Sequence, residues 1–261
     1  MTTAVWGRAE RAHWYTQQVR TRSYRDDVLD KLAPLTSHFE RLEYGALSID
    51  PERYPLVALK SLGWREDLPV LLVTGGVHGY ETSGVQGALD FAQIATRYTE
   101  HLNILICPCV SPWGYETINR WNPQAIDPNR SFIGEGQSEE SRALIALYNS
   151  LEQDVVMHID LHETTDTDNS VFRPALAARD GLALQQWHIP DGYYLVGDAE
   201  RPVAAFQRAI IEAVAKVTHI AAPDAQGEII GEPITQPGVI NYRARALGLC
   251  AGMTKADYVT T

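Results

Sequence analysis

Two short strings hold the residue types that bind metal ions. His78 and Glu81 lie in the string LLVTGGVHGYE, and His162 lies in the later string DLHE. Zinc takes neutral imidazole and carboxylate ligands, and a catalytic zinc site keeps three protein ligands and leaves its fourth position to water. The sequence therefore predicts one zinc ion per chain, bound by His78, Glu81 and His162.

Both strings follow apolar runs that are typical of strands covered on both faces. The first run spans residues 69–74 and ends at two glycines, and the second spans residues 155–161. Ligands of open α/β sheets bind at the carboxyl ends of the strands, so we expect the two strings to meet there. Asp160 can accept a hydrogen bond from a ligand imidazole and fix its tautomer, although a turn carboxylate in solvent is the alternative.

Strand and helix patterns alternate around these strings. The predicted strands cover residues 39–47, 54–62, 69–74, 102–110, 155–161, 193–196 and 258–261. The predicted helices cover residues 8–32, as one or two surface helices, and residues 81–97, 138–151 and 202–217. Strand, helix and strand in succession form a βαβ unit. We therefore predict an α/β fold, one domain over residues 1–261, whose mixed, mainly parallel central sheet is flanked by helices, with residues 1–35 as an N-terminal helical extension.

Composition excludes several kinds of partner. The 261 residues carry a net charge of −11 and contain no basic run with interleaved aromatic residues, so nucleic acid is not an expected partner. The N-terminus is polar, and no apolar stretch reaches the length of a membrane span. Three cysteines suit reduced core thiols better than a disulfide framework. We expect a soluble, cytoplasmic protein, and the oligomeric state stays open.

Further strings between and around the predicted ligands give the chain a resemblance to a known family. HGYE is followed by PWGYE at residues 112–116, by an arginine, by DPNRSF at residues 127–132 and then by DLHE. In this order the strings resemble those of the zinc metallocarboxypeptidases. The related aspartoacylase and succinylglutamate desuccinylase group is also similar, since it carries HxxE, a DxNR-like string and DLH followed by Thr-Thr. The likeness covers roughly residues 70–165.

The resemblance implies roles for four more residues. It makes Arg120 the group that polarises the scissile carbonyl, and it makes Asn129 and Arg130 the clamp on a substrate carboxylate. Tyr242 matches the tyrosine of the loop that covers the substrate. A guanidinium can bind a carboxylate through two parallel hydrogen bonds and can stabilise an oxyanion, so the chemistry agrees with these roles.

The general base is the open point of this interpretation. Carboxypeptidases carry a glutamate on a late strand, which here would begin near Tyr258, yet the sequence runs Tyr-Val-Thr-Thr and ends. Either the chain stops just short of that glutamate or the base lies elsewhere. Glu232 is the first candidate, because its surroundings are similar to the glutamate segment of aspartoacylase, and Glu228 and Glu163 follow.

Together these features predict a zinc-dependent hydrolase that cleaves an amide bond next to a free carboxylate, a metallocarboxypeptidase with small peptides as substrates. An N-acyl amino acid deacylase of the aspartoacylase type would use the same metal and clamp. A non-catalytic, metal-dependent binder of peptide C-termini is the alternative outside the enzyme class. The carboxylates at Asp160, Glu163, Asp166 and Asp168 also leave open whether a second metal ion binds.

Overall fold

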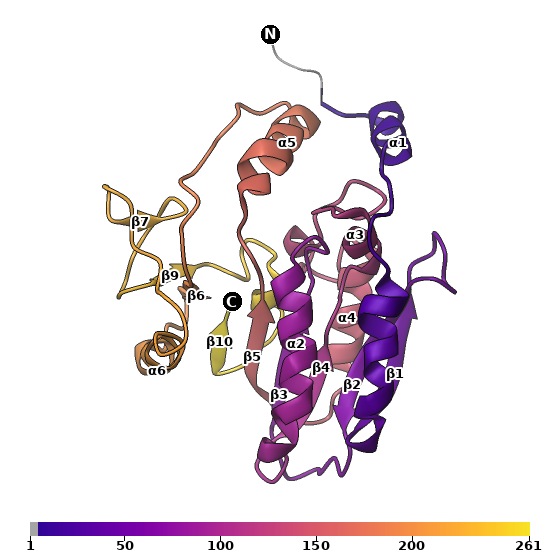
Figure 1. The fold of residues 1–261 in the computed structure, drawn as a ribbon, viewed down its shortest axis with the longest axis vertical. Coiled ribbons are helices and arrows are strands. Elements are labelled where there is room, and N and C mark those ends of the chain that lie inside the picture. The colour runs from indigo at the N-terminus through magenta and orange to yellow at the C-terminus, as the bar shows by residue number, and fades with distance from the viewer. Residues whose placement is uncertain (1–4) are drawn as a thin grey trace. The chain divides into compact units, whose positions relative to one another are not determined.

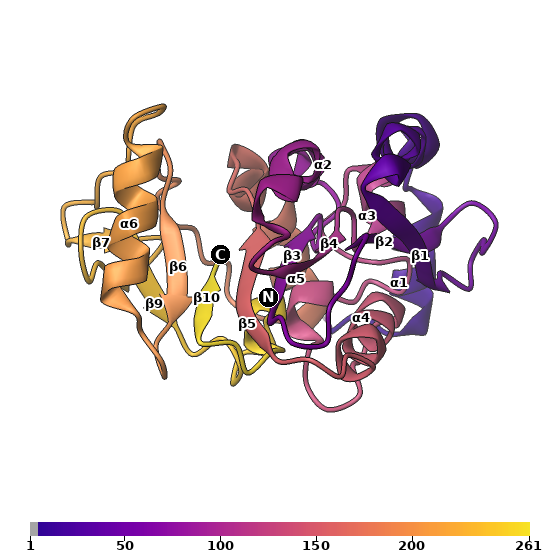
Figure 2. The same ribbon diagram turned by 90° about the horizontal axis from the view of Figure 1, so that it is seen from below.

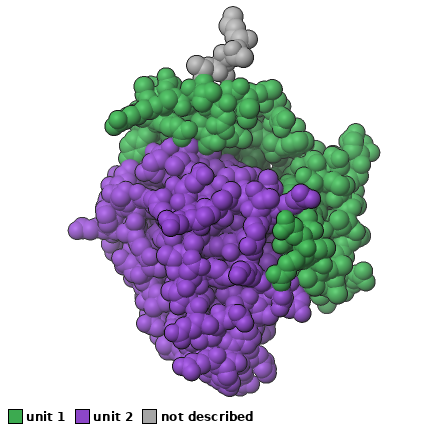
Figure 3. Space-filling model, turned by 180° about the vertical axis from the view of Figure 1, so that it is seen from behind, with its two compact units in different colours: residues 1–18, 164–242 green, residues 19–163, 243–261 purple. Residues whose placement is uncertain are grey.

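The computed structural model describes residues 5–261, and the part of the predicted N-terminal extension at residues 1–4 lies outside the described residues. The chain forms two compact units, which Figure 3 draws in different colours. The smaller unit comprises residues 5–18 and 164–242 of the described chain, and the larger comprises residues 19–163 and 243–261. Each unit is described by itself.

The larger unit is built on a mixed sheet. Its strands follow one another in the order β1-β2-β4-β3-β5-β10. The strands are β1 (Phe39–Ala46), β2 (Pro55–Ser61), β3 (Val70–Gly75), β4 (Asn103–Cys107), β5 (Val155–Leu161) and β10 (Tyr258–Thr260). The pairs β1/β2 and β2/β4 are antiparallel, whereas β4/β3, β3/β5 and β5/β10 are parallel. The predicted α/β class with a mixed, mainly parallel sheet is thus confirmed.

Helices cover both faces of this sheet. Figures 1 and 2 show α2 (Thr82–Ile94) on one face and α4 (Glu139–Asn149) on the other. Every residue of β3 and β4 is buried, as the continuous apolar runs of these strands predict. The short helix α3 (Pro112–Thr117) follows β4, and it is buried along its whole length.

Residues 8–32 differ from the prediction of surface helices. Only α1 (Arg8–Thr16), which belongs to the smaller unit, is an exposed α-helix. The helical turns η1 (Arg25–Leu29) and η2 (Asp30–Ser37) pack against the core, where Tyr24, Val28 and Leu32 are at most 1% exposed. Sequence reasoning missed this because the apolar residues that form the buried stripe are diluted by charged neighbours.

The smaller unit contains short elements. Strands β6 (Leu195–Asp198) and β9 (Val239–Tyr242) pair in parallel, and α6 (Ala204–Val214) packs on β6. Strands β7 (Glu228–Ile229) and β8 (Glu232–Pro233) form a tight hairpin.

The remaining helical elements of the described residues are distributed over both units. They are η3 (Ala95–Tyr98), η4 (Pro128–Arg130) and η6 (Cys250–Gly252) in the larger unit, and η5 (Asp168–Phe172) and α5 (Arg173–Asp180) in the smaller unit.

Most other predicted elements are present with small shifts of their ends. Strands β1, β2, β3 and β5 and helices α2, α4 and α6 all occur where the patterns place them. No helix in residues 5–261 is long and apolar enough to cross a membrane. The predicted domain organisation, one domain over residues 1–261 with a helical extension at 1–35, stays a prediction.

Candidate metal centre

The first predicted ligand string leaves β3 through a tight loop. Gly76 has a φ of +59°, a conformation that side chains disfavour. A Cβ atom on Gly79 would lie 2.1 Å from the backbone nitrogen of Tyr115, so the loop packs directly on α3. The loop delivers His78, and Glu81 follows as the N-cap residue of α2. Because β3 and β5 are parallel and Gly75 pairs with Leu161, the loop and His162 emerge at the same edge of the sheet.

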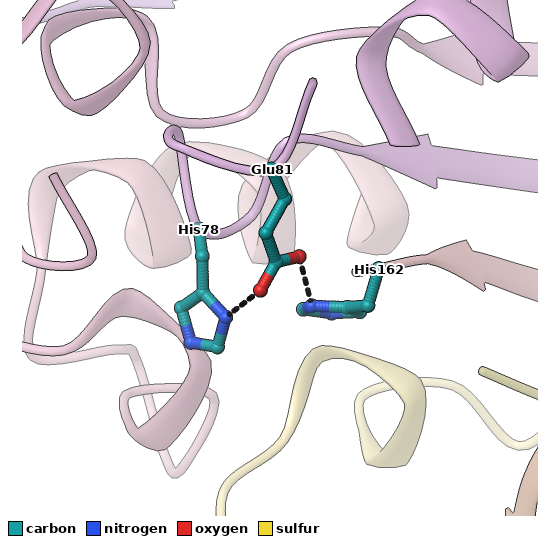
Figure 4. A group of neighbouring side chains, drawn as sticks. All are labelled: His78, Glu81 and His162. Atoms are coloured by element: carbon teal, nitrogen blue, oxygen red, sulfur yellow. Dashed lines mark hydrogen bonds and ion pairs between the residues drawn. The ribbon is translucent and has the colours of Figure 1, made fainter. Parts of the chain in front are cut away.

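The three predicted ligands converge there. The Nδ1 atoms of His78 and His162 lie 2.7 Å from Glu81 Oε1 and Oε2 respectively, so the carboxylate stands between the two rings (Figure 4). One ligand atom from each residue lies within 4.8 Å of the others. The side chains of His78 and Glu81 are 4% and 2% exposed, and that of His162 is 13% exposed.

A second carboxylate supports each imidazole from behind. His78 Nε2 lies 3.1 Å from Asp127 Oδ1, and His162 Nε2 lies 2.9 Å from Asp160 Oδ2. Both rings therefore turn Nδ1 toward Glu81 and Nε2 toward an outer carboxylate. Such outer carboxylates fix the tautomer and the orientation of metal-binding histidines.

The charges of the site stabilise one another. Burial alone would raise the pKa of Glu81, but His162 and His78 lower that pKa to about 2. Burial alone would lower the pKa of His162, but Glu81 and Asp160 raise it to about 10. Burial likewise opposes ionisation of Asp127, yet Arg120 and His78 hold the pKa of that carboxyl well below its usual range. The site is thus a buried, ionised cluster when no metal ion is bound.

The donor set of this cluster fits a metal ion. Two imidazole nitrogens and one carboxylate are the ligands of many catalytic zinc sites, which leave a further position open. A second group, His158, Asp160 and Cys250, also brings its ligand atoms within 4.8 Å of one another. The hydroxyl of Thr74, however, lies within hydrogen-bond distance of two members of that group: Oγ1 is 2.6 Å from Asp160 Oδ1 and 3.1 Å from His158 Nε2. The second group is therefore a hydrogen-bonded network.

Three of the residues predicted to contact substrate, Arg120, Asn129 and Arg130, belong to the same unit as this cluster. Arg120 Nε donates to Asp127 Oδ2 at 3.0 Å, which connects this guanidinium to His78 through one carboxylate. Asn129 Nδ2 lies 3.4 Å from His162 Nε2, and Asn129 Oδ1 accepts a hydrogen bond from the backbone of Cys250. Arg130 is exposed, and its Nη1 donates to the carbonyl of Asn129 at 2.7 Å.

The three glutamates considered as bases have different surroundings. Glu163 Oε2 accepts hydrogen bonds from Ser83 N and Oγ at 3.0 and 2.9 Å, so this carboxylate caps the N-terminus of α2. Glu228 and Glu232 lie on the two strands of the β7/β8 hairpin in the smaller unit, where Glu228 pairs with Pro233 and Glu232 pairs with Ile229. Tyr242 also belongs to that unit, at the end of β9.

Sequence reasoning missed three buried residues beside the predicted ligands. Asp127 lies in the string DPNR, but the family resemblance implies roles only for Asn129 and Arg130 in that string. Its position two residues before Asn129, on a loop that returns to the ligands, is the signal that could have found it. Thr74 and His158 carried no sequence signal, because both lie inside apolar strands and read as ordinary core positions.

Residues 60–229 match the family described as "Protein of unknown function (DUF2817)", and the chain belongs to this family. No curated protein matches the chain. Among solved structures, a protein from Shewanella amazonensis that carries a provisional metallopeptidase name is similar over 91% of this chain and 85% of its own, with 22% identity and a TM-score of 0.62.

Two further solved structures are similar to the chain. Bovine thrombin-activatable fibrinolysis inhibitor, solved with tick carboxypeptidase inhibitor, matches 95% of this chain and 86% of its own, with 14% identity and a TM-score of 0.57. A metallo-carboxypeptidase from Burkholderia cenocepacia matches 85% of this chain and 54% of its own, with 16% identity and a TM-score of 0.55. These likenesses show that the chain has a metallocarboxypeptidase-like fold, which confirms the resemblance in the sequence at the level of the fold.

Proposed function

We propose that the chain is a zinc-dependent hydrolase that cleaves an amide bond next to a free carboxylate, as a metallocarboxypeptidase acting on small peptides. The observation that carries the proposal is the common orientation of the two imidazoles. Each has Nδ1 beside Glu81 and Nε2 on an outer carboxylate. When each imidazole carries its proton on Nε2, the lone pairs of both Nδ1 atoms and the Glu81 carboxylate are available to bind one metal ion, as a catalytic zinc site requires.

The proposed chemistry divides between the ion and the protein. Zinc in such a site supplies Lewis acidity, which lowers the pKa of water and polarises a carbonyl. Arg120 stabilises negative charge on the carbonyl oxygen of the substrate, and its ion pair with Asp127 limits the motion of its guanidinium. Asn129 and Arg130 bind the terminal carboxylate of the substrate. Tyr242 covers the substrate, and Glu232 moves the proton from water to the leaving amine.

A deacylase acting on N-acyl amino acids is the second candidate. One observation favours it, namely that Thr164 and Thr165 follow the last ligand as they do in the aspartoacylase group. The two activities share the metal and the carboxylate clamp and differ in substrate size. A binder of peptide C-termini without turnover is the third possibility, and it requires that no group acts as the base.

A cytoplasmic location belongs to the same proposal. All three cysteines, Cys107, Cys109 and Cys250, are free and buried, as is usual for proteins that fold under reducing conditions.

Metal analysis combined with a turnover assay tests the proposal. The wild type should bind about one zinc per chain and release the C-terminal residue from N-blocked dipeptides, but not from the matching amides. His162→Ala should lose nearly all metal and turnover. His219→Ala, at an exposed histidine that contacts Asp191, is the matched control and should change neither. Cleavage of N-acetyl amino acids alone would favour the deacylase, affinity without product would favour the binder, and metal retained in His162→Ala would refute the site.

A further inference from the structure

A buried polar network lies directly behind the proposed ligand His162. It consists of Thr74, His158, Asp160, Cys250 and Thr254, and we call it the Thr74 network. Its members are 0–3% exposed, so water does not satisfy their hydrogen-bonding groups. Each polar atom must therefore find its partner within the protein, which restricts the positions of the hydrogen atoms.

The Thr74 hydroxyl has three neighbours and one proton. Its Oγ1 lies 2.6 Å from Asp160 Oδ1, 3.1 Å from His158 Nε2 and 3.7 Å from Cys250 Sγ. A carboxylate can only accept hydrogen bonds, so Thr74 gives its proton to Asp160. The two lone pairs of Thr74 then accept from the Nε2–H of His158 and from the thiol of Cys250. One donor and two acceptors are the full capacity of a hydroxyl group.

This assignment fixes the rest of the network. His158 must carry a proton on Nε2, and its Nδ1 then faces Thr254 Oγ1 at 3.4 Å, where it accepts from that hydroxyl. At the other end, Asp160 uses Oδ1 for Thr74 and Oδ2 for His162 Nε2 at 2.9 Å. Because both oxygens of Asp160 are engaged, the carboxylate cannot rotate away from His162 without breaking a buried hydrogen bond.

We propose that Thr74 and His158 are positioning residues that hold Asp160 as the acceptor of the His162 Nε2 proton and so keep Nδ1 of His162 directed at the metal ion. The inference rests on the proposed zinc site and adds two residues that do not touch the ion. The orientation of Asp160 requires the hydroxyl of Thr74 and a proton on Nε2 of His158. Side chains of the same size that lack these groups should not replace them.

Zinc affinity of matched variants tests the role of the hydroxyl. Thr74→Val keeps the shape and removes the donor, and it should weaken zinc binding roughly tenfold, the lower end of the effect of losing an outer partner. Thr74→Ser should restore affinity. Thr117→Val, which removes another buried hydroxyl that donates to Trp113 O, should bind zinc as the wild type does. In the background of Asp160→Asn, Thr74→Val should weaken zinc binding little further, since both changes interrupt one network.

The absorption spectrum of the cobalt-substituted protein gives a second readout. Thr74→Val should shift the visible bands, because the imidazole of His162 is held differently, and Thr117→Val should leave them unchanged. Wild-type affinity and an unchanged spectrum in Thr74→Val would overturn the proposal.

Nitrogen NMR of the metal-free wild type tests the network without any metal. The His158 ring, assigned by its loss in His158→Gln, should show a protonated Nε2 and an unprotonated Nδ1. The opposite tautomer would overturn the network even if zinc binds as proposed. If the expected tautomer is found but the wild type binds no zinc, the network stands as a structural fact, while the proposed function and the role toward the metal fail.

Discussion

At the scale of single residues, the two imidazoles differ in what supports them. Asp127 accepts hydrogen bonds from His78, from Arg120 and from the backbone nitrogen of Asn129, so one carboxylate connects a proposed ligand to two residues proposed to bind substrate. A change at Asp127 should therefore affect both the metal and the substrate. Asp160 instead contacts buried core residues, so a change there should affect the metal alone.

Removing the charge of Asp127 is the first test of this difference. Asp127→Asn should weaken zinc binding about 10–100-fold and also raise KM, because His78 and Arg120 both lose an ionised acceptor. Titration with zinc and steady-state kinetics measure the two effects. Asp191→Asn is the control, since Asp191 also contacts a histidine, His219, but the pair is exposed. Unchanged zinc affinity in Asp127→Asn would refute the supporting role of the carboxylate.

Arg130 is the residue on which the carboxylate clamp depends. Arg130→Ala should weaken binding of free-acid substrates by about 1.5–3 kcal/mol, the scale of a hydrogen bond to a charged group. Binding of the corresponding amides should hardly change. Arg142→Ala removes an arginine that contacts the carbonyl of Gln137 instead, and serves as the control for loss of positive charge. If Arg130→Ala weakened the binding of free acids and of amides equally, Arg130 would not bind the substrate carboxylate.

Glu232 is the residue proposed to move protons. Glu232→Gln should keep the zinc content and the fold and reduce kcat by roughly two to four orders of magnitude, the usual contribution of a general base. Single-turnover rates with zinc-loaded protein measure the change, and Glu212→Gln, at an exposed position of α6, is the control. Rates that are indifferent to Glu232 would require another proton acceptor.

At the scale of helices and strands, the sequence predicts the elements that carry the ligands. The apolar runs of β3 and β5 and the glycines after β3 identify the strand ends and place His78, Glu81 and His162 at one edge. Predictions were less successful where periodicity is weak. Short elements such as α3, the β7/β8 hairpin and α5 depend on tertiary contacts, so local patterns do not reveal them.

The packing of α2 on β5 is the element contact that sets the distance between Glu81 and His162. A Cβ atom at Gly84 would lie 2.4 Å from the carbonyl oxygen of Leu161, a backbone atom that cannot move aside cheaply. Gly84→Ala should therefore separate α2 from β5, lower the free energy of unfolding by about 1–3 kcal/mol and weaken zinc binding.

Gly87 provides the matched control for this packing. A Cβ atom there meets only Leu161 Cδ1, at 3.7 Å, which is ordinary contact. Gly87→Ala should leave zinc binding unchanged and raise the free energy of unfolding by about 0.5–1 kcal/mol, since alanine favours the helix. Urea denaturation and zinc titration of both variants measure the difference. Equal behaviour of the two alanine variants would contradict the close approach of α2 to β5.

At the scale of the whole molecule, the buried ionisable groups determine how stability depends on pH. Among the groups facing the core of the larger unit, Glu81, Asp127 and Asp160 have lowered pKa values, and that of His162 is raised to about 10. The carboxylates stabilise the fold above their ordinary pKa values, and His162 does so in full below about pH 6.5. Without metal, these four groups contribute steadily between about pH 4.5 and 6.5, so the pH dependence of stability in that window comes from other buried groups, among them His158.

His158 should make the metal-free protein less stable across this window. Burial lowers the pKa of His158 to about 4, whereas an unfolded histidine titrates near 6.5. Below pH 6.5 the unfolded state therefore binds more protons, and the free energy of unfolding falls as the pH falls, by about 3 kcal/mol when pH 4 is reached. Urea denaturation in the presence of a chelator, at several pH values between 7 and 4.5, measures this loss. His158→Gln cannot take up the proton and should show a smaller loss, and comparison with it removes the opposite contribution of Glu140, whose pKa burial raises. Parallel pH profiles for the wild type and His158→Gln would show that His158 is not held as a neutral imidazole in the folded protein.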